Sequence, residues 1–536
     1  MKRRSVVKWV AAFPLLAQVG LEQALGTGWA EIARNSTDNI YTRLGVKPLI
    51  NGRGTWHDPE AGGGNHHWPE STAVADTGSA AGNSIMRTAA SCLLALAVAA
   101  SSARAEPSPC RVQPVVFEGW QAQQVANDWV QLTFVPQLGG RLLQVTFNGH
   151  PYLFVNPAYK GKYISPAEAA GRWINYGGDK IWPLPEGNDD EQHWQGASTP
   201  LDDGAYTFSV VSQGAKCTVR LEGPPDPPTG LQYTREISIA RDSPQIFFHA
   251  ITKNFTGHSI TWSVQSVSQY NLSDANDRTQ YNHNFWAITP LNPHSAYLLG
   301  YHVRDGLAND PSFSVKDGLF RLNWRYLENE VWLDSSAGWL ALIDGATKYA
   351  MVEKTRHIAD GDYPSKATTI FYKNGPTVEL NEKGMPYLTS SGIEKTPYYM
   401  EAEMNSPMAV LGPGETYSFD TNWFPTRLSG ELTSVTEAGV VAQALAARRT
   451  GDKVDLAGSF GVFFPGDLKA YLYDEGGLKT SEVSLQAVQP QDPVTLHQSI
   501  AAARNIARVS IHLIESSGVD RGALGEVFVT IGGEGH

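Results

Sequence analysis

Apolar and polar residues alternate in short runs from Val112 to about Arg427. Such a period of two is typical of β-strands with one buried face. The runs include VQLTFVP, GRLLQVTFNG, CTVRLEG, YTREISIA, QIFFHAITKN and ITWSVQSVSQ. Turn residues separate them at short intervals, and the one helical turn that we expect lies at Pro166 to Gly171. The pattern predicts a mainly β fold with a large antiparallel sandwich in this part of the chain.

The last part of the chain carries a second, smaller β pattern. An alanine-rich stretch, VVAQALAARR, follows Arg427, and after it come the strand candidates KVDLAGSF, LKAYLYD, RVSIHLIES and EVFVTIGG. No cluster of acids and bases beside aromatic residues occurs here. We expect residues 428–536 to form a small appended β-domain with a packing or partner-binding role.

Residues 1–105 have the pattern of two protein starts joined end to end. The first, MKRRSVVKWVAAFPLLAQVG, has a basic start with Arg3 and Arg4 before a modest apolar run, which resembles a twin-arginine export signal. A polar, glycine-rich stretch without periodicity follows at residues 58–84. We therefore predict that residues 1–85 are a disordered remnant of an upstream gene or of a misplaced start.

The second start has the three parts of a secretory signal peptide. Met86 and Arg87 precede the apolar run LLALAVAA, and an A-x-A cleavage site ends at Ala105. The apolar run is too short to span a membrane comfortably. We predict a signal peptide at residues 86–105 and a periplasmic or secreted protein from Glu106 onward, without a stable membrane span. The alternative is a buried helix of a genuine N-terminal domain.

Charge and cysteine content narrow the classes of function. The formal net charge of −12 argues against a nucleic-acid surface, because phosphate binding needs clustered Lys and Arg and the sequence shows no such cluster. Cys110 and Cys217 form either one disulfide or two free thiols, since Cys92 lies in the predicted signal peptide. The chain has no Cys/His metal spacing, no phosphate loop and no GxSxG nucleophile motif. We predict no metal and no cofactor.

The densest run of candidate chemistry is WINYGGDKIWPLPEG, from Trp173 to Gly187. Two glycines and two prolines interrupt it, so we predict a loop. Its aromatic rings could cover the C–H face of a sugar, while its polar groups could bond the hydroxyls. In the alternative interpretation, the tryptophans fill one edge of the core. The predicted sugar-binding residues of this run are Trp173, Asn175, Tyr176, Asp179, Lys180 and Trp182.

Four segments together resemble a known family: GGRLLQVTFNGHPYLFVNP, NYGGDKIWPLPEG, NFTGHSITWSVQSVSQ and YYMEAEMNSPMAVLGPGETYSFDTNW. In order and content they resemble the bacterial domain of unknown function 4380, which is similar to galactose mutarotases. The resemblance covers residues 112–427 and implies a galactose-mutarotase-like β-supersandwich over residues 106–427.

A separate stretch, Asn39 to Trp56, resembles the N-terminus of selenocysteine-synthase relatives. It stops before any pyridoxal-phosphate site, so no such function is expected.

In mutarotases a carboxylate takes the proton from the anomeric hydroxyl while an acid, usually His, protonates the ring oxygen. The resemblance places Glu401 at the position of the base. Glu403 lies two residues on, so both side chains are expected to project from one face of a strand. Two adjacent carboxylates raise the pKa of at least one of them. The alternative is a pair of exposed acids at a sheet edge.

The identity of the general acid stays open. At the place where mutarotases carry their His motif, His258 lies in a predicted turn and the strand presents Gln265 and Gln269, so Gln269 is a predicted sugar ligand. His193, His283 and Lys180 are the other candidates for the acid. Arg141 resembles an early strand residue that reaches the sugar, although a structural ion pair explains it equally well.

These observations predict an exported carbohydrate-binding protein with aldose 1-epimerase chemistry on a free sugar. A saccharide is the predicted ligand, and protein partners are left open. Two alternatives remain: a non-catalytic glycan-recognition protein, and a polysaccharide lyase or glycoside hydrolase.

Overall fold

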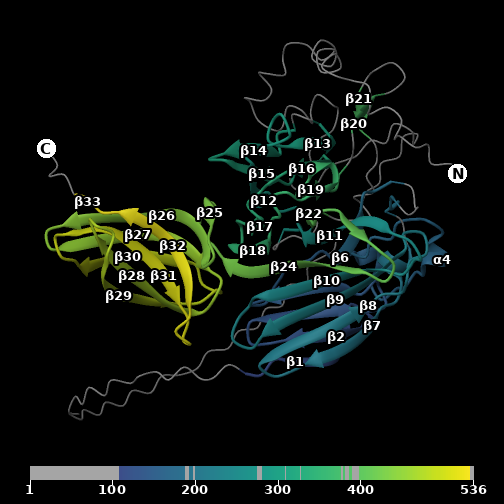
Figure 1. Cartoon of the computed structure of the whole chain (residues 1–536), viewed down its shortest axis with the longest axis horizontal. Helices are drawn as coiled ribbons and strands as arrows, with labels where there is room; N and C mark the ends of the chain where they lie inside the picture. The colour runs from purple at the N-terminus through teal and green to yellow at the C-terminus, as the bar shows by residue number, and fades with distance from the viewer. Residues whose placement is uncertain are drawn as a thin grey trace, which may run out of the picture.

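The computed structural model of the chain describes residues 108–531, apart from 188–191, 197–198, 275–280, 308–309, 326, 376–377, 381–385 and 389–397. Strands dominate this part of the chain, and its helices are single short turns (Figure 1). The mainly β fold predicted from the alternation is confirmed. The predictions for residues 1–85 and 86–105 and the resemblance at Asn39 to Trp56 lie outside the described residues.

The largest sheet has twelve strands among the described residues. Its order is β1 (Arg111–Phe117), β2 (Trp120–Ala126), β3 (Val130–Val135), β4 (Arg141–Phe147), β6 (Asp179–Leu184), β11 (Ile260–Asn271), β22 (Tyr399–Asn405), β19 (Thr369–Lys373), β16 (Asn329–Leu333) and β13 (His302–Asp305). Strand β5 (His150–Pro151) pairs with β4, and β23 (Ala409–Leu411) pairs with β11. Neighbouring strands are antiparallel throughout.

A second sheet stacks on the first. Its order is β14 (Phe313–Lys316), β15 (Leu319–Asn323), β12 (Phe285–Pro290), β17 (Trp339–Asp344), β18 (Tyr349–Thr355), β24 (Thr416–Arg427), β10 (Ile246–Asn254), β9 (Leu231–Ala240), β8 (Lys216–Glu222) and β7 (Thr207–Ser212). The helical turns are η2 (Pro157–Tyr159), α4 (Pro166–Ala169), α5 (Pro200–Asp203) and η3 (Pro364–Lys366), and α4 confirms the one helical turn expected from the sequence. Strands β20 (Val378–Leu380) and β21 (Pro386–Leu388) pair in a separate two-stranded antiparallel ribbon.

A small sandwich of two sheets follows the large pair. One sheet holds β25 (Ser434–Val435), β26 (Gly439–Thr450), β27 (Lys453–Val462), β30 (Val494–Ala501) and β33 (Thr530–Ile531). The other holds β29 (Lys479–Val488), β28 (Gly466–Asp474), β31 (Ile506–Ile514) and β32 (Asp520–Phe528). In Figure 1 this small sandwich, drawn in yellow, lies beside β18 and β24.

Strand β17 shows how the three layers are joined. All six of its residues, WLALID, are buried. Leu340 and Leu342 belong to the core between the two large sheets, whereas Ala341 and Ile343 belong to a second core shared with the small sandwich. Because side chains alternate across a strand, the outer face of the second sheet is the surface on which the small sandwich packs.

The loop prediction for Trp173 to Gly187 is wrong in its middle, because Asp179–Leu184 forms strand β6 inside the largest sheet. Both faces of this strand are covered, so all six residues are buried and no alternation is visible in the sequence. The prediction of irregular backbone holds for the preceding turn. There Gly177 has a φ of +93°, and an added Cβ would lie 2.1 Å from the carbonyl oxygen of Phe154.

Cys110 and Cys217 are joined in a disulfide. The bond ties the residue before β1, in the largest sheet, to β8 in the second sheet. Of the two alternatives for these cysteines, the structure therefore has the bonded one.

In the part of the chain that the structure describes, we find no helix with the length and apolar character needed to cross a bilayer.

Candidate functional site

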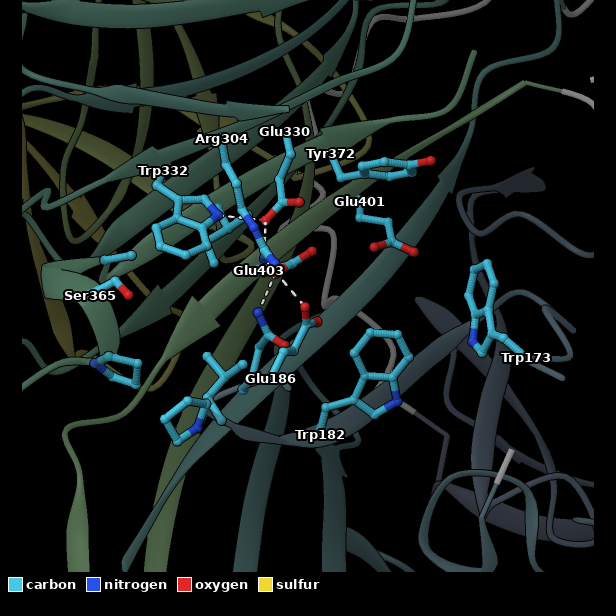
Figure 2. A pocket seen from close by; sticks show the side chains of 16 residues that line it. Trp173, Trp182, Glu186, Arg304, Glu330, Trp332, Ser365, Tyr372, Glu401 and Glu403 are labelled. Atoms are coloured by element: carbon cyan, nitrogen blue, oxygen red, sulfur yellow. Dashed lines mark hydrogen bonds and ion pairs between the residues drawn. The ribbon is translucent and has the colours of Figure 1, made fainter. Parts of the chain in front are cut away.

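A cavity of about 230 Å³ lies on the face of the largest sheet that points away from the second sheet (Figure 2). It extends over six adjacent strands, β6, β11, β22, β19, β16 and β13, and η3 contributes to its rim. The lining residues are Trp173, Trp182, Leu184, Pro185, Glu186, Gln265, Arg304, Glu330, Trp332, Pro364, Ser365, Ala367, Ile370, Tyr372, Glu401 and Glu403.

Strand β22 divides its side chains between core and cavity. Met400, Ala402 and Met404 belong to the core between the large sheets, and Glu401 and Glu403 line the cavity. The prediction that both carboxyl groups project from one face of a strand is confirmed. The same alternation that builds the core therefore places two acids side by side in the cavity.

Strands β16 and β13 bring further charged groups to the same face. On β16, Val331 and Leu333 enter the core while Glu330 and Trp332 line the cavity. Arg304 reaches the cavity from the edge strand β13, which carries a register irregularity at this point. This edge of the sheet thus adds a cation, a carboxyl group and an indole ring.

Strands β6 and β19, which are separated by β11 and β22, hold rings that wall the cavity. The indole of Trp182, on β6, packs at 4.7 Å between ring centroids on the buried Trp194, and its Nε1 donates to Asp202 over 2.7 Å. The Tyr372 hydroxyl, on β19, donates to Glu328 over 2.6 Å. These contacts fix the ring orientations, so the walls are preformed apolar surfaces of the kind that stack on sugar rings.

Glu401 and Glu403 are both buried, and each accepts a hydrogen bond from a glutamine amide on β11. Gln269 Nε2 donates to Glu401, and Gln265 Nε2 donates to Glu403. Burial raises the pKa of Glu403 well above its usual value, and the neighbouring carboxylates, Glu401 first, raise it further. The direction agrees with the rise expected for one member of the pair, although burial contributes more to it than the neighbouring carboxylate. A raised pKa favours the protonated form of Glu403, which can donate a proton.

Arg304 is held between two carboxyl groups, as Figure 2 shows. Its Nη1 lies 3.3 Å from Glu186 and 3.1 Å from Glu330. Burial raises the pKa of Glu330 to about 8, although Arg304 opposes that rise. The guanidinium also lies 4.9 Å from the centroid of the Trp332 ring. Arg304 is thus fixed by protein groups on several sides.

Lys180 lies behind the tryptophan wall and not among the lining residues. Its Nζ is 3.7 Å from the ring centroid of Trp182 and 5.1 Å from that of Trp173. The ammonium is buried and has no hydrogen-bond acceptor among the described groups. Burial lowers the pKa of Lys180, while Glu401 raises it. Lys180 therefore contacts the two indole rings of the cavity wall from behind.

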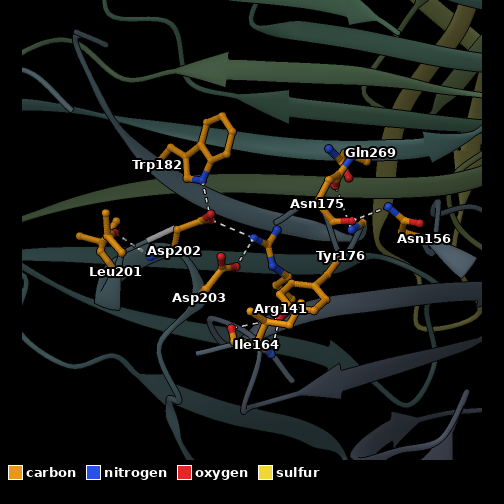
Figure 3. A network of polar contacts seen from close by, with 12 residues as sticks. Arg141, Asn156, Ile164, Asn175, Tyr176, Trp182, Leu201, Asp202, Asp203 and Gln269 are labelled. Atoms are coloured by element: carbon orange, nitrogen blue, oxygen red, sulfur yellow. Dashed lines mark hydrogen bonds and ion pairs between the residues drawn. The ribbon is translucent and has the colours of Figure 1, made fainter. Parts of the chain in front are cut away.

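Arg141 lies in a buried network beside the cavity (Figure 3). Its guanidinium pairs with Asp202 over 2.9 Å and with Asp203 over 3.0 Å. Because Trp182 donates to the same Asp202, Arg141 is linked to the cavity wall through one carboxylate. The structure places it in the ion-pair role that the sequence left as its alternative, and it does not line the cavity.

Three other predicted sugar ligands have internal partners and lie outside the lining. Asp179 forms an ion pair with Arg235 of β9, across the two large sheets. The Tyr176 hydroxyl accepts from the backbone N–H of Ile164 over 2.9 Å. Asn175 Oδ1 accepts from the Gly177 N–H over 3.1 Å. Gln269 also lies outside the lining, but it positions Glu401. Trp173 and Trp182 are the two predicted ligands that face the cavity.

Neither candidate histidine lines the cavity. His193 follows a gap in the described residues and packs against Gly187, whose added Cβ would lie 2.9 Å from the His193 Cβ. His283 packs on Tyr281 at 4.1 Å between ring centroids, and partial burial lowers its pKa. No histidine occurs among the described residues that line the cavity.

Among the charged residues and tryptophans that line the cavity, four were not predicted from the sequence: Glu186, Arg304, Glu330 and Trp332. Glu330 and Trp332 had a signal, because NEVWL alternates and puts both on one face of a strand. Glu186 lies inside the singled-out stretch of residues 173–187. Arg304 had no signal, since it lies on a short edge strand.

No protein-family profile and no curated protein match this chain. Solved structures do match. A TPR-domain containing protein from Parabacteroides distasonis shares 12% identity over 59% of this chain, with a TM-score of 0.38, and the match spans 53% of that protein. A galactose mutarotase-like protein from Clostridium acetobutylicum shares 10% over 59% of this chain and 99% of its own, with a TM-score of 0.38. A putative mutarotase from Salmonella typhimurium shares 12% over 59% of this chain and 94% of its own, with a TM-score of 0.39.

Proposed function

We propose that the cavity binds one saccharide ring and that Glu401 and Glu403 interconvert its anomers, as in an aldose 1-epimerase. The observation that carries the proposal is the placement of two adjacent, buried carboxyl groups in a cavity walled by tryptophan. The cavity, at about 230 Å³, lies below the roughly 300–1,000 Å³ of pockets for larger ligands. This size favours a monosaccharide.

The proposed reaction needs one base and one acid on the same sugar. Glu401 takes the proton of the anomeric hydroxyl while Glu403 gives its proton to the ring oxygen, and the bond from C1 to the ring oxygen breaks. The open-chain aldehyde turns about the C1–C2 bond. Closure in the other anomeric form then returns both protons, so no co-reactant is consumed.

The different environments of the two acids support this division of roles. The protonated form of Glu403 is favoured because burial and three nearby carboxylates raise its pKa. Residues two apart on a strand lie roughly 6.5–7 Å apart along the chain, which leaves room for the C1–O segment of a sugar between the carboxyl groups. The pair thus supplies the acid that histidine provides in mutarotases.

The test is NMR exchange spectroscopy on the full chain with free hexoses and pentoses. We expect enzyme-dependent exchange between the two anomeric resonances, and Glu401→Gln and Glu403→Gln should each slow it at least ~100-fold while ligand binding persists. Glu222→Gln, at an exposed position on β8, is the matched control and should exchange like the wild type. Undiminished exchange in both cavity variants would contradict the assignment.

A non-catalytic glycan-recognition protein is the second candidate. It is favoured by the absence of a histidine among the described lining residues. In that case sugars should shift or broaden resonances without exchange between anomers, and Glu401→Gln should change affinity alone.

We also propose that the mature protein is exported and begins near Glu106. The Cys110–Cys217 disulfide supports export, because such bonds persist in oxidising compartments. Membership of the domain of unknown function 4380 family stays a prediction that rests on the segments quoted above. Mass spectrometry of the protein secreted by its host tests the cleavage site, and an N-terminus before Met86 would contradict it.

A further inference from the structure

The hydrogen-bond donors that line the cavity are largely occupied by protein acceptors. Arg304 gives its Nη1 to Glu186 and Glu330. Gln265 gives its amide group to Glu403. Two ring donors follow the same rule, because Trp332 Nε1 donates to Glu330 and the Tyr372 hydroxyl donates to Glu328. The exception is Trp173 Nε1, a buried donor without a hydrogen-bond partner.

The acceptors, in contrast, are in excess. Four carboxyl groups line the cavity, those of Glu186, Glu330, Glu401 and Glu403, and Arg304 is the only basic residue among the described lining residues. Gln265 Oε1 is a fifth acceptor; the residue is 2% exposed and this atom has no hydrogen-bond partner. A buried acceptor without a partner is unfavourable unless a ligand supplies a donor. The cavity is therefore matched to a ligand that donates.

The charge balance leads to the same conclusion. Arg304, the one basic side chain among the described residues of the lining, is shared between two carboxyl groups and faces the Trp332 ring, so little of its charge is left for a ligand. Lys180 is covered by the indoles of Trp173 and Trp182 and does not reach the lining. An anionic ligand would meet carboxyl groups without a free cation, whereas an ammonium group would gain charge-assisted hydrogen bonds.

We propose that the cavity selects an amino sugar over the corresponding neutral hexose and rejects uronic acids and sugar phosphates. The inference rests on the proposed function, in that it takes the ligand to be a saccharide, and it adds the class of sugar. The ammonium group would lie by the carboxyl group of Glu186 and the free Gln265 Oε1. Glu330 and Glu403 would add acceptor oxygens, because a carboxyl group that carries a proton still accepts hydrogen bonds, and the ring would lie on the tryptophan wall.

The experiment is isothermal titration of the full chain, at pH 6 and low salt, with glucosamine, galactosamine, their neutral parents and the two corresponding uronic acids. We expect the amino sugars to bind about tenfold more tightly than the neutral hexoses, since a hydrogen bond to a charged group is stronger than a neutral one. The uronic acids should bind at least about tenfold more weakly than the hexoses. Added salt should reduce the amino-sugar preference, and N-acetylation, which removes the charge, should abolish it.

A variant of the carboxylate set gives an independent readout. Glu186→Gln removes one acid from the cavity and frees part of the Arg304 guanidinium, so the preference for amino sugars should fall and uronic-acid binding should rise. Circular dichroism checks its fold, and the wild-type series alone decides the proposal if the variant does not fold. An equal or reversed order of affinities would overturn the amino-sugar inference and leave saccharide binding standing. Absence of binding by every sugar would overturn both.

Discussion

Glu353 is a buried carboxyl group that lies between the two large sheets and outside the cavity. It lies on β18 and accepts hydrogen bonds from the hydroxyls of Ser268 over 2.7 Å and Tyr270 over 2.6 Å. Burial raises its pKa to about 8. It therefore carries a proton near neutral pH, and its ionisation would place a charge in the core.

This shift gives stability a dependence on pH that runs opposite to that of a salt-bridged acid. The folded pKa lies above the unfolded value, so the stabilisation is fully present below pH 4.5 and is lost as pH rises to about 8. In this window the contribution of Glu353 to the free energy of unfolding should change by at most about 1.4 kcal/mol per pH unit. We expect Glu353→Gln, which cannot ionise, to flatten the fall in the free energy of unfolding measured by urea titration between pH 5 and 8. The exposed Glu222→Gln should keep the wild-type slope, and equal slopes in all three proteins would refute the assignment.

At the scale of single strands, side-chain alternation explains which parts of the site were predictable. The sequence YYMEAEMNSP alternates visibly, so the shared face of Glu401 and Glu403 could be inferred. Strand β6 could not be recognised in the sequence, because both of its faces are covered and Pro183 lies within it. Two-sided burial erases the period of two on which such a prediction depends.

The wider composition of the cavity depends on strand order, which local sequence does not contain. Glu330 and Arg304 approach Glu403 because the sheet places β22, β19, β16 and β13 side by side. Pairing between strands far apart in the chain is set by the packing of the whole sheet. For the same reason Arg141 could not be assigned to Asp202 and Asp203, which lie 61 and 62 residues later in the chain.

Strand β22 also allows stability to be separated from function within a few residues. Met400 faces the core and is fully buried, so Met400→Ala should lower the free energy of unfolding by about 2–5 kcal/mol. It should leave sugar affinity unchanged below the unfolding transition. Glu401→Gln should show the opposite profile, with stability within about 1 kcal/mol of the wild type and anomeric exchange lost. Denaturant titration of both variants measures the change in stability, and NMR exchange measures the change in anomer interconversion. Comparable loss of exchange in Met400→Ala would mean that the two faces of the strand do not act independently.

For the whole molecule, the small sandwich and the large one share a continuous hydrophobic core. Ala341, Ile343 and Val352 from the second large sheet lie in the same cluster as Phe463 and Leu496 of the small sandwich. Removing the small sandwich would expose this apolar face to water, which is unfavourable in proportion to its area. The two parts should therefore unfold together.

The distribution of tryptophan makes this coupling measurable, because the chain has no tryptophan after Trp423. Tryptophan fluorescence therefore carries no signal from the small sandwich. It comes from the large sandwich and from Trp9, Trp29, Trp56 and Trp68, which precede the described residues. Phe463 lies in the small sandwich, is fully buried, and stacks on Phe424 of β24 at 4.6 Å between ring centroids. Phe463→Ala should cost about 3–5 kcal/mol and should lower the denaturation midpoint seen by tryptophan fluorescence and by far-ultraviolet circular dichroism equally. Phe528→Ala, at a position 72% exposed on β32, should leave both midpoints in place. If the dichroism midpoint falls and the fluorescence midpoint stays, the small sandwich unfolds independently, and the shared core adds little to the stability of the part that holds the cavity.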